Sequence, residues 1–153
     1  MHVCIGGTFN PLHEGHKLLI RTACAVAGPA GSVYIGITCG TQFSSYKKIP
    51  SYRERKKILQ QFILEEQIST TICFGRLTDK YGPSITDDFD AIVVSPETKP
   101  TAVEINRIRQ SRQKKPLQII EIPFVLAEDA KPISSTRIRN KEIDIHGRLI
   151  CRD

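Results

Sequence analysis

The sequence predicts an α/β fold in which a doubly wound, five-stranded parallel sheet is flanked by helices in a single domain over residues 1–153. Short apolar runs rich in β-branched residues alternate with segments whose apolar residues recur at helical spacing. The first run ends in two glycines and leads directly into a helix signal, as in the βα units of parallel sheets. At 153 residues, 40% of them hydrophobic, the chain is long enough to bury one full core.

The first third of the chain supplies two strands and a helix between them. We expect a strand over 2–6 and a helix over 12–28, with Asn10 as the N-cap and Pro11 at the first helical position. The segment 32–39 is β-branched and aromatic, as a buried parallel strand should be.

A capping box opens the second helix, because Ser51 is followed three residues later by Glu54. A strand over 70–74 comes next, and then a connection over 75–88 with a short helix near Ser84. The length of this connection suggests a loop over the site. The core-facing stripe of the second helix is expected to contain Ile58, Leu59, Phe62 and Ile63.

The last third continues the alternation. We expect a strand over 90–95, a helix over 101–114 opened by a second capping box of Thr101 and Glu104, and a final strand from Leu117. In such a Rossmann-like sheet the strand order reverses between the first and fourth strands, so the loops that follow these two strands flank one crevice. Most basic residues of the third helix are expected to be surface charges: Arg107, Arg109, Arg112, Lys114 and Lys115.

The stretch from Gly6 to His16, GGTFNPLHEGH, is suited to binding phosphate. Gly6 and Gly7 can adopt positive φ and carry no Cβ, so an anion can approach the backbone N–H groups closely. His13, His16 and Lys17 then lie in the first helical turns, where the helix dipole disfavours cations unless an anion is bound. The histidines could instead be surface residues or zinc ligands, although no further zinc ligand stands nearby in the chain.

The polar loop over 39–50 lies at the carboxyl end of the second strand, the edge at which open α/β sheets bind ligands. Lys47 and Lys48 therefore face the same edge as the glycine turn, either as ligands or as a solvated pair. Arg53, at the start of the second helix, could reach a phosphate or be solvated with its basic neighbours Arg55, Lys56 and Lys57.

Hydroxyl and carboxylate groups follow the fourth strand in SPET, where Ser95, Glu97 and Thr98 could bind a nucleobase amine or a ribose. The alternative is a strand-ending turn with Thr98 as a helix cap.

A second candidate phosphate site is ISSTRIR, residues 133–139. Ser134 or Ser135 is expected to cap a helix whose first turn carries Arg137 and Arg139, again cations placed against the dipole. Hydroxyl groups, free N–H groups and Arg137 would together hold an anion. The alternative is that the arginines are exposed to solvent.

Composition restricts the class of partner and the compartment. The net charge is +6, from 22 Lys and Arg against 16 Asp and Glu, and it favours anionic ligands. No RNA-binding aromatic motif is present, which argues against a nucleic-acid partner. The five cysteines show no CxxC spacing and suggest a reducing compartment. With no apolar run long enough to span a bilayer, we expect a cytoplasmic protein without a membrane partner.

GGTFNPLHEGH resembles the phosphate-binding HxGH motif of the cytidylyltransferase-like nucleotidyltransferase superfamily. VVSPET at 93–98, INRIR at 105–109 and ISSTRIR at 133–139 are similar to the archaeal type of phosphopantetheine adenylyltransferase. The resemblance implies an enzyme that transfers AMP from ATP to 4′-phosphopantetheine, forming dephospho-coenzyme A and pyrophosphate. Mg²⁺ would be carried by the ATP phosphates, with no dedicated protein site.

The resemblance also assigns roles to residues. The acceptor phosphate would be held by Thr8, Asn10 and Lys47, and its oxygen would attack the α-phosphate of ATP while His16 and Lys47 stabilise the charge. Asn10 stands where the family most often has Asp, so a role that needs a carboxylate there does not carry over. The residues implied for ATP are Gly7, Thr8, Phe9, His13, His16, Ser95, Glu97, Thr98, Ser134, Ser135, Thr136 and Arg137.

Other activities share the first motif. Flavin mononucleotide adenylyltransferase and glycerol-3-phosphate cytidylyltransferase use the same HxGH, and a domain of this kind could also bind nucleotide or RNA without turnover. The SPET and ISSTRIR resemblances favour phosphopantetheine as the acceptor. Feedback by coenzyme A, the oligomeric state and the choice between Lys47 and Lys48 stay open.

Overall fold

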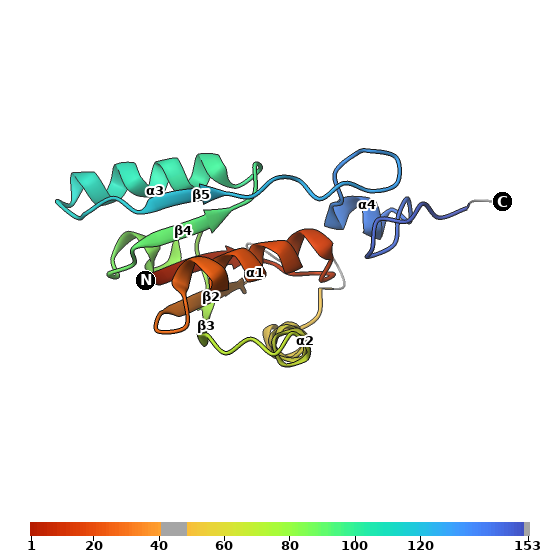
Figure 1. Cartoon of the computed structure of the whole chain (residues 1–153). Helices are drawn as coiled ribbons and strands as arrows, with labels where there is room; N and C mark the ends of the chain where they lie inside the picture. The colour runs from red at the N-terminus through yellow and green to blue at the C-terminus, as the bar shows by residue number, and fades with distance from the viewer. Residues whose placement is uncertain (41–48, 152–153) are drawn as a thin grey trace.

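A computed structural model describes residues 1–40 and 49–151 of the chain (Figure 1). Strands and helices alternate along it as the sequence predicts. The ordered elements are β1 (His2–Gly7), α1 (Glu14–Ala27), β2 (Ser32–Thr38), α2 (Tyr52–Glu65), β3 (Thr71–Leu77), the 3₁₀ helix η2 (Gly82–Ile85), β4 (Ala91–Val94), α3 (Lys99–Ser111), β5 (Gln118–Glu121) and α4 (Ser135–Arg139).

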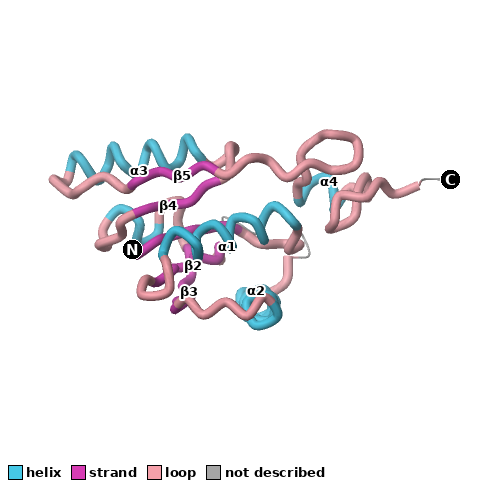
Figure 2. The backbone as a smooth tube through the Cα atoms, viewed as in Figure 1, coloured by secondary structure: helices cyan, strands magenta, loops and turns pink. Residues whose placement is uncertain are grey.

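All five strands form one parallel sheet in the order β3-β2-β1-β4-β5. The order reverses at β1, where Val3 pairs with Val33 on one side and with Ala91 on the other. The predicted doubly wound, Rossmann-like α/β fold is therefore confirmed. Figure 2 shows this single sheet with helices on both sides.

The alternation of side chains along β1 divides the core into two layers. Val3 and Ile5 pack with α1 and α2 in the larger cluster, whereas Cys4 packs with Ala102 and Ile105 of α3 in the smaller one. Successive strand residues point to opposite faces, so one strand supplies both layers. No helix in the described part of the chain is long and apolar enough to cross a membrane.

Two predicted helix starts are wrong, and that of α2 is confirmed. The N-cap of α1 is His13 rather than Asn10, because the His13 ring itself accepts the hydrogen bond from the first turn. Helix α3 begins at Lys99, so Thr101 is already helical and cannot cap it. Ser51 and Glu54 form the predicted capping box of α2.

The burial of three helix residues differs from the prediction. Ile58 was expected in the core but is 49% exposed. Arg55 and Arg109 were expected at the surface but are buried, at 5% and 2% exposure. Arg109 donates to the carbonyls of Lys115, Ser84 and Asp87, each at 2.8 Å, so peptide oxygens replace the water that a surface arginine would bind.

The residues after β5 form a small unit beyond the carboxyl end of that strand (Figure 1). Two isolated antiparallel bridges, Leu126–Pro132 and Ile143–Leu149, surround its own buried cluster of Ala127, Ile133 and Ile143. His146 Nδ1 lies 3.1 Å from Glu14 Oε1 and so links the unit to the start of α1. This contact brings α4 next to the glycine turn.

We predict that Arg109→Met lowers the free energy of unfolding by roughly 3 kcal/mol or more, because three carbonyl groups lose their donor. Arg107→Ala, on the exposed face of the same helix, is the matched control and should change it by less than about 0.5 kcal/mol. Urea denaturation of both variants measures the difference. Equal effects would mean that the buried hydrogen bonds of Arg109 contribute nothing to stability.

Candidate active site

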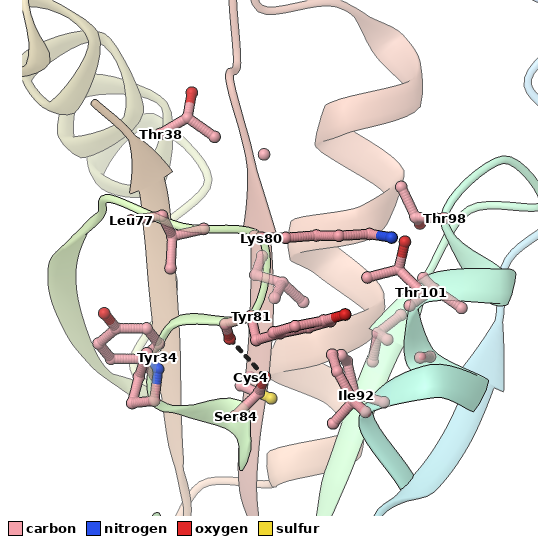
Figure 3. Close-up of a pocket in the computed structure, with 18 of the residues that line it drawn as sticks. Cys4, Tyr34, Thr38, Leu77, Lys80, Tyr81, Ser84, Ile92, Thr98 and Thr101 are labelled. Atoms are coloured by element: carbon pink, nitrogen blue, oxygen red, sulfur yellow. Dashed lines mark hydrogen bonds between the residues drawn. The ribbon is translucent and has the colours of Figure 1, made fainter. Parts of the chain in front are cut away.

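Two cavities meet at the carboxyl ends of β1 and β4. The larger, about 610 Å³, is the phosphate cleft; it lies between the glycine turn, the start of α1, the SPET turn and α4. The smaller, about 210 Å³, is the apolar pocket; it lies on the α3 side of the sheet (Figure 3). Gly6, Gly7 and Thr98 line both, so the cavities adjoin at the point where the strand order reverses.

Most of the predicted site residues gather around the phosphate cleft, although they come from distant parts of the chain. Lys47 and Lys48 lie outside the described residues. Arg137 does not line the cleft, whereas Arg139 does. The predicted residues that line it are Gly7, Thr8, Phe9, Asn10, His13, His16, Ser95, Glu97, Thr98, Ser134, Ser135 and Thr136.

Phe9 supports the glycine turn from within. Its φ is 51°, in the left-handed region, and its side chain is only 2% exposed. The ring lies 5.2 Å from that of His16, centroid to centroid, and a Cβ added at Gly7 would meet it at 3.4 Å. The turn is thus shaped by a buried aromatic ring as well as by glycine.

The two histidines cap α1 instead of repelling its dipole. His13 Nδ1 accepts from the Gly15 N–H at 3.0 Å, and His16 Nδ1 accepts from the His13 N–H at 3.3 Å. Burial lowers the pKa of His13 to about 4 and, together with the neighbouring His13, that of His16 to about 3. The expectation that these residues are cations awaiting an anion is therefore wrong.

A neutral imidazole that accepts at Nδ1 carries its hydrogen on Nε2. Both rings are therefore N–H donors in the wall of the phosphate cleft, stacked with their centroids 3.8 Å apart. Such donors can bind phosphate oxygens without titrating near neutral pH. Their occupied Nδ1 atoms also make a poor zinc pair, and the described residues contain no group of three or more His, Cys, Asp or Glu arranged around a common point.

Thr8 is held from two sides by residues that the sequence did not single out. Thr38 Oγ1 donates to Thr8 Oγ1 at 3.0 Å, and Arg55 Nη1 donates to the Thr8 carbonyl at 3.0 Å. Arg53 is exposed and does not line the cleft, which agrees with the solvated alternative for this residue. Arg55 does not line it either, but it contacts the glycine turn through the Thr8 carbonyl.

The ISSTRIR segment is built as predicted at its cap but not at its arginines. Ser134 Oγ accepts from the Arg137 N–H at 3.2 Å, so Ser134 caps α4. The Arg137 guanidinium turns away to pair with Asp129 and to donate to the Pro132 carbonyl at 3.0 Å. Arg139 instead donates to the Asn10 carbonyl at 3.2 Å, across the cleft.

The SPET turn faces the same cleft. Thr98 Oγ1 accepts from the Ser95 N–H at 3.0 Å and lies 3.1 Å from Ser95 Oγ. Glu97 is exposed at the rim. The hydroxyl groups thus stabilise the strand-ending turn and also line the cleft, and Thr98 precedes α3 without a capping hydrogen bond from its side chain.

The apolar pocket was not predicted, because its walls come from elements far apart in sequence. Cys4, Tyr34, Leu77 and Ile92 line its apolar interior. Figure 3 shows Lys80 and Tyr81 reaching from the segment between β3 and η2 towards Thr98 and Thr101. Glu104 of α3 holds both, accepting from Lys80 Nζ at 2.9 Å and from the Tyr81 hydroxyl.

Comparison with known proteins agrees with this geometry. A sequence profile described as cytidylyltransferase-like matches residues 4–141, and the chain belongs to this family of nucleotidyltransferases. Its relatives include the phosphopantetheine adenylyltransferases of three archaea. That of Methanosarcina mazei is 47% identical and aligns over 96% of each chain. That of Methanopyrus kandleri is 41% identical, over 99% of this chain and 94% of its own, and that of Archaeoglobus fulgidus is 36% identical, over 98% and 100%.

Solved structures show the same fold. A protein of unknown function from Archaeoglobus fulgidus superposes with a TM-score of 0.70 at 30% identity, covering 80% of this chain and 98% of its own. Pantothenate synthetase from Thermus thermophilus superposes with a TM-score of 0.57 at 15% identity, covering 90% and 60%. The second likeness concerns the fold alone.

We predict that the neutral histidines make the fold sensitive to acid. The pKa values of the two histidines are about 4 and about 3 in the fold but near 6.5 in the unfolded chain. Unfolding therefore takes up protons around and below pH 6.5, and the free energy of unfolding decreases as the pH is lowered. Each histidine should contribute a loss of about 2 kcal/mol between pH 7 and 5.

His13→Asn tests this, because asparagine can cap α1 but does not titrate. Between pH 7 and 5 the variant should lose about 2 kcal/mol less than the parent chain in urea denaturation. Parallel pH profiles for the two proteins would show that His13 is not held neutral by the fold.

Proposed function

We propose that this chain transfers AMP from ATP to 4′-phosphopantetheine, forming dephospho-coenzyme A and pyrophosphate. One observation carries the proposal beyond the relatives' activity: a cleft lined by phosphate-binding groups adjoins an apolar pocket, with Thr8 of the cleft 3.0 Å from Thr38 of the pocket. ATP would occupy the cleft, the pantetheine arm the pocket, and the acceptor phosphate their junction.

In this arrangement the chemistry is an in-line displacement. An oxygen of the acceptor phosphate, already anionic at neutral pH, forms a bond to the α-phosphorus, and the bond from that phosphorus to the bridging oxygen of pyrophosphate breaks. No side chain has to act as nucleophile or general base. Thr8 and Asn10 hold the acceptor phosphate, and the His16 Nε2–H group stabilises the charge at the α-phosphate. Lys47 keeps the same proposed role from the sequence.

The remaining cleft residues would bind the rest of the nucleotide. Ser95, Glu97 and Thr98 are suited to the adenosine, and the hydroxyls of Ser135 and Thr136 to the departing pyrophosphate. Arg139 takes the part first given to Arg137, because it is the arginine of α4 that lines the cleft. Coenzyme A contains both halves of the product, so it would fit the same two cavities as a feedback ligand.

Mg²⁺ would arrive with the triphosphate, as the resemblance implies. Bound there, it would neutralise phosphate charge and so favour departure of pyrophosphate. The five cysteines are free, which suits the reducing cytoplasm that we propose as its location.

The proposal is tested by pyrophosphate release from ATP and Mg²⁺ with each of four acceptors: 4′-phosphopantetheine, flavin mononucleotide, glycerol 3-phosphate and nicotinamide mononucleotide. We expect release with 4′-phosphopantetheine alone, and a weaker rate when CTP replaces ATP. Release with a different acceptor would overturn the substrate assignment and keep the reaction type. No release with any of them would favour a module that only binds nucleotide.

The catalytically impaired control is His16→Ala, which removes one N–H donor to the charge that develops at the α-phosphate. Its turnover should fall by at least ~10², the usual effect of losing one such donor. His2→Ala, at the opposite end of β1, should keep the parent rate. Equal rates in all three proteins would trace the release to a contaminant or remove His16 from the mechanism.

A further pair of variants separates the two arginines of α4. Arg139→Ala should raise KM for ATP about tenfold or more, because a hydrogen bond to a charged phosphate is lost, and should also unfold at somewhat lower urea, because Arg139 donates to the Asn10 carbonyl. Arg137→Ala should unfold at lower urea, because its pairing with Asp129 is lost, with KM for ATP close to the parent value. The reverse pattern of KM values would restore Arg137 as the phosphate ligand.

A further inference from the structure

Arg55 lies beside the junction of the two cavities and joins three segments of the site. Its Nε donates to the Pro50 carbonyl at 2.9 Å, and its Nη1 donates to the Thr8 carbonyl at 3.0 Å and towards Thr38 Oγ1 at 3.5 Å. The start of α2, the glycine turn and the end of β2 are thereby held by one side chain that is 5% exposed.

Arg55 has no acidic partner among the residues that the structure describes. The sequence over 41–48 contains neither Asp nor Glu. Burial lowers the pKa of Arg55, yet a guanidinium remains protonated at neutral pH. Among the described residues its acceptors are carbonyl and hydroxyl oxygens, which leave a positive potential near the junction.

The same hydrogen bonds fix the direction in which two hydroxyl groups donate. Thr38 Oγ1 donates its single hydroxyl hydrogen to Thr8 Oγ1, 3.0 Å away, and presents a lone pair to Arg55 Nη1 at 3.5 Å. Thr8 Oγ1 is then an acceptor within the protein, and no acceptor for its own hydrogen lies among the described residues, so that hydrogen can point to a ligand. An anion at the junction would receive that hydrogen.

We propose that Arg55 and Thr38 are positioning residues that set the Thr8 hydroxyl as a donor to the acceptor phosphate, while Arg55 adds a positive charge behind it. This inference rests on the proposed function, because it assumes that a phosphate lies at the junction. It differs from a purely structural role, which would hold the turn in place whether or not the ligand carried a phosphate.

Thr38→Val tests the hydrogen-bond relay, since valine has nearly the same shape and no hydroxyl. We expect KM for 4′-phosphopantetheine to rise about tenfold or more, the effect of losing a hydrogen bond to a charged group, and KM for ATP to stay within about twofold. Thr38→Ser should rescue the acceptor KM. Thr70→Val, half-buried at the opposite end of the sheet, is the matched control and should behave like the parent.

Binding of 4′-phosphopantetheine and of pantetheine, measured by calorimetry, separates the proposed role from a structural one. The parent should prefer the phosphorylated ligand, and this preference should shrink about tenfold in Thr38→Val and in Arg55→Met while pantetheine binding is retained. Arg55→Lys should keep part of the preference, because it keeps the charge. An equal loss for both ligands, or an unchanged preference, would overturn the inference.

Failure of the proposed function would be seen separately, as an absence of turnover with 4′-phosphopantetheine in the parent chain. Binding of inorganic phosphate would then test the relay alone. Phosphate binding that is weakened about tenfold by Thr38→Val and kept by Thr38→Ser would uphold it. Phosphate binding that is identical in the parent and the valine variant would reject it.

Discussion

The pairing of β1 with both β2 and β4 determines where ligands can bind. A strand at the point of reversal has connections leaving in opposite directions on its two sides, so no crossover helix covers its carboxyl end. The glycines that end β1 therefore line two cavities at once. A cleft for a nucleotide and a pocket for an apolar chain can adjoin at this place and at few others in such a sheet.

Two buried arginines have no acidic partner in the part of the chain that the structure describes. Arg55 and Arg109 each donate to backbone carbonyl oxygens of the segments that connect strands and helices. A carboxylate would cancel the charge, whereas carbonyl groups satisfy the N–H donors and leave it largely in place. Beside the phosphate cleft, such a residue combines support of the backbone with attraction for anions.

Much of the fold follows from the sequence, because apolar periodicity reports burial directly: the five strands, the reversal of their order between the first and fourth, and the capping box of α2 are confirmed. The errors have identifiable causes. His13 is not among the usual capping residues, so the predicted start of α1 lies too early in the chain. Arg55 shares the helical spacing of the buried Leu59 and Phe62, and Arg109 that of Ala102 and Ile105, but their charge was given more weight than their position. The apolar pocket depends on tertiary contacts that no local pattern contains.

The hydrogen-bond donors at the site are of two kinds, neutral histidines and charged arginines. The two histidines are held neutral because their Nδ1 atoms cap α1, so they donate through Nε2 without adding charge to the helix terminus. Positive charge comes instead from Arg55 and Arg139, which approach from α2 and α4. Under the proposed function, the neutral donors would stabilise charge that develops at the α-phosphate during displacement, while the arginines would attract the phosphates of both substrates. A site made only of cations would bind substrates and products with similar strength. Neutral histidine donors would add hydrogen bonds to the developing charge without strengthening the attraction for the products to the same extent.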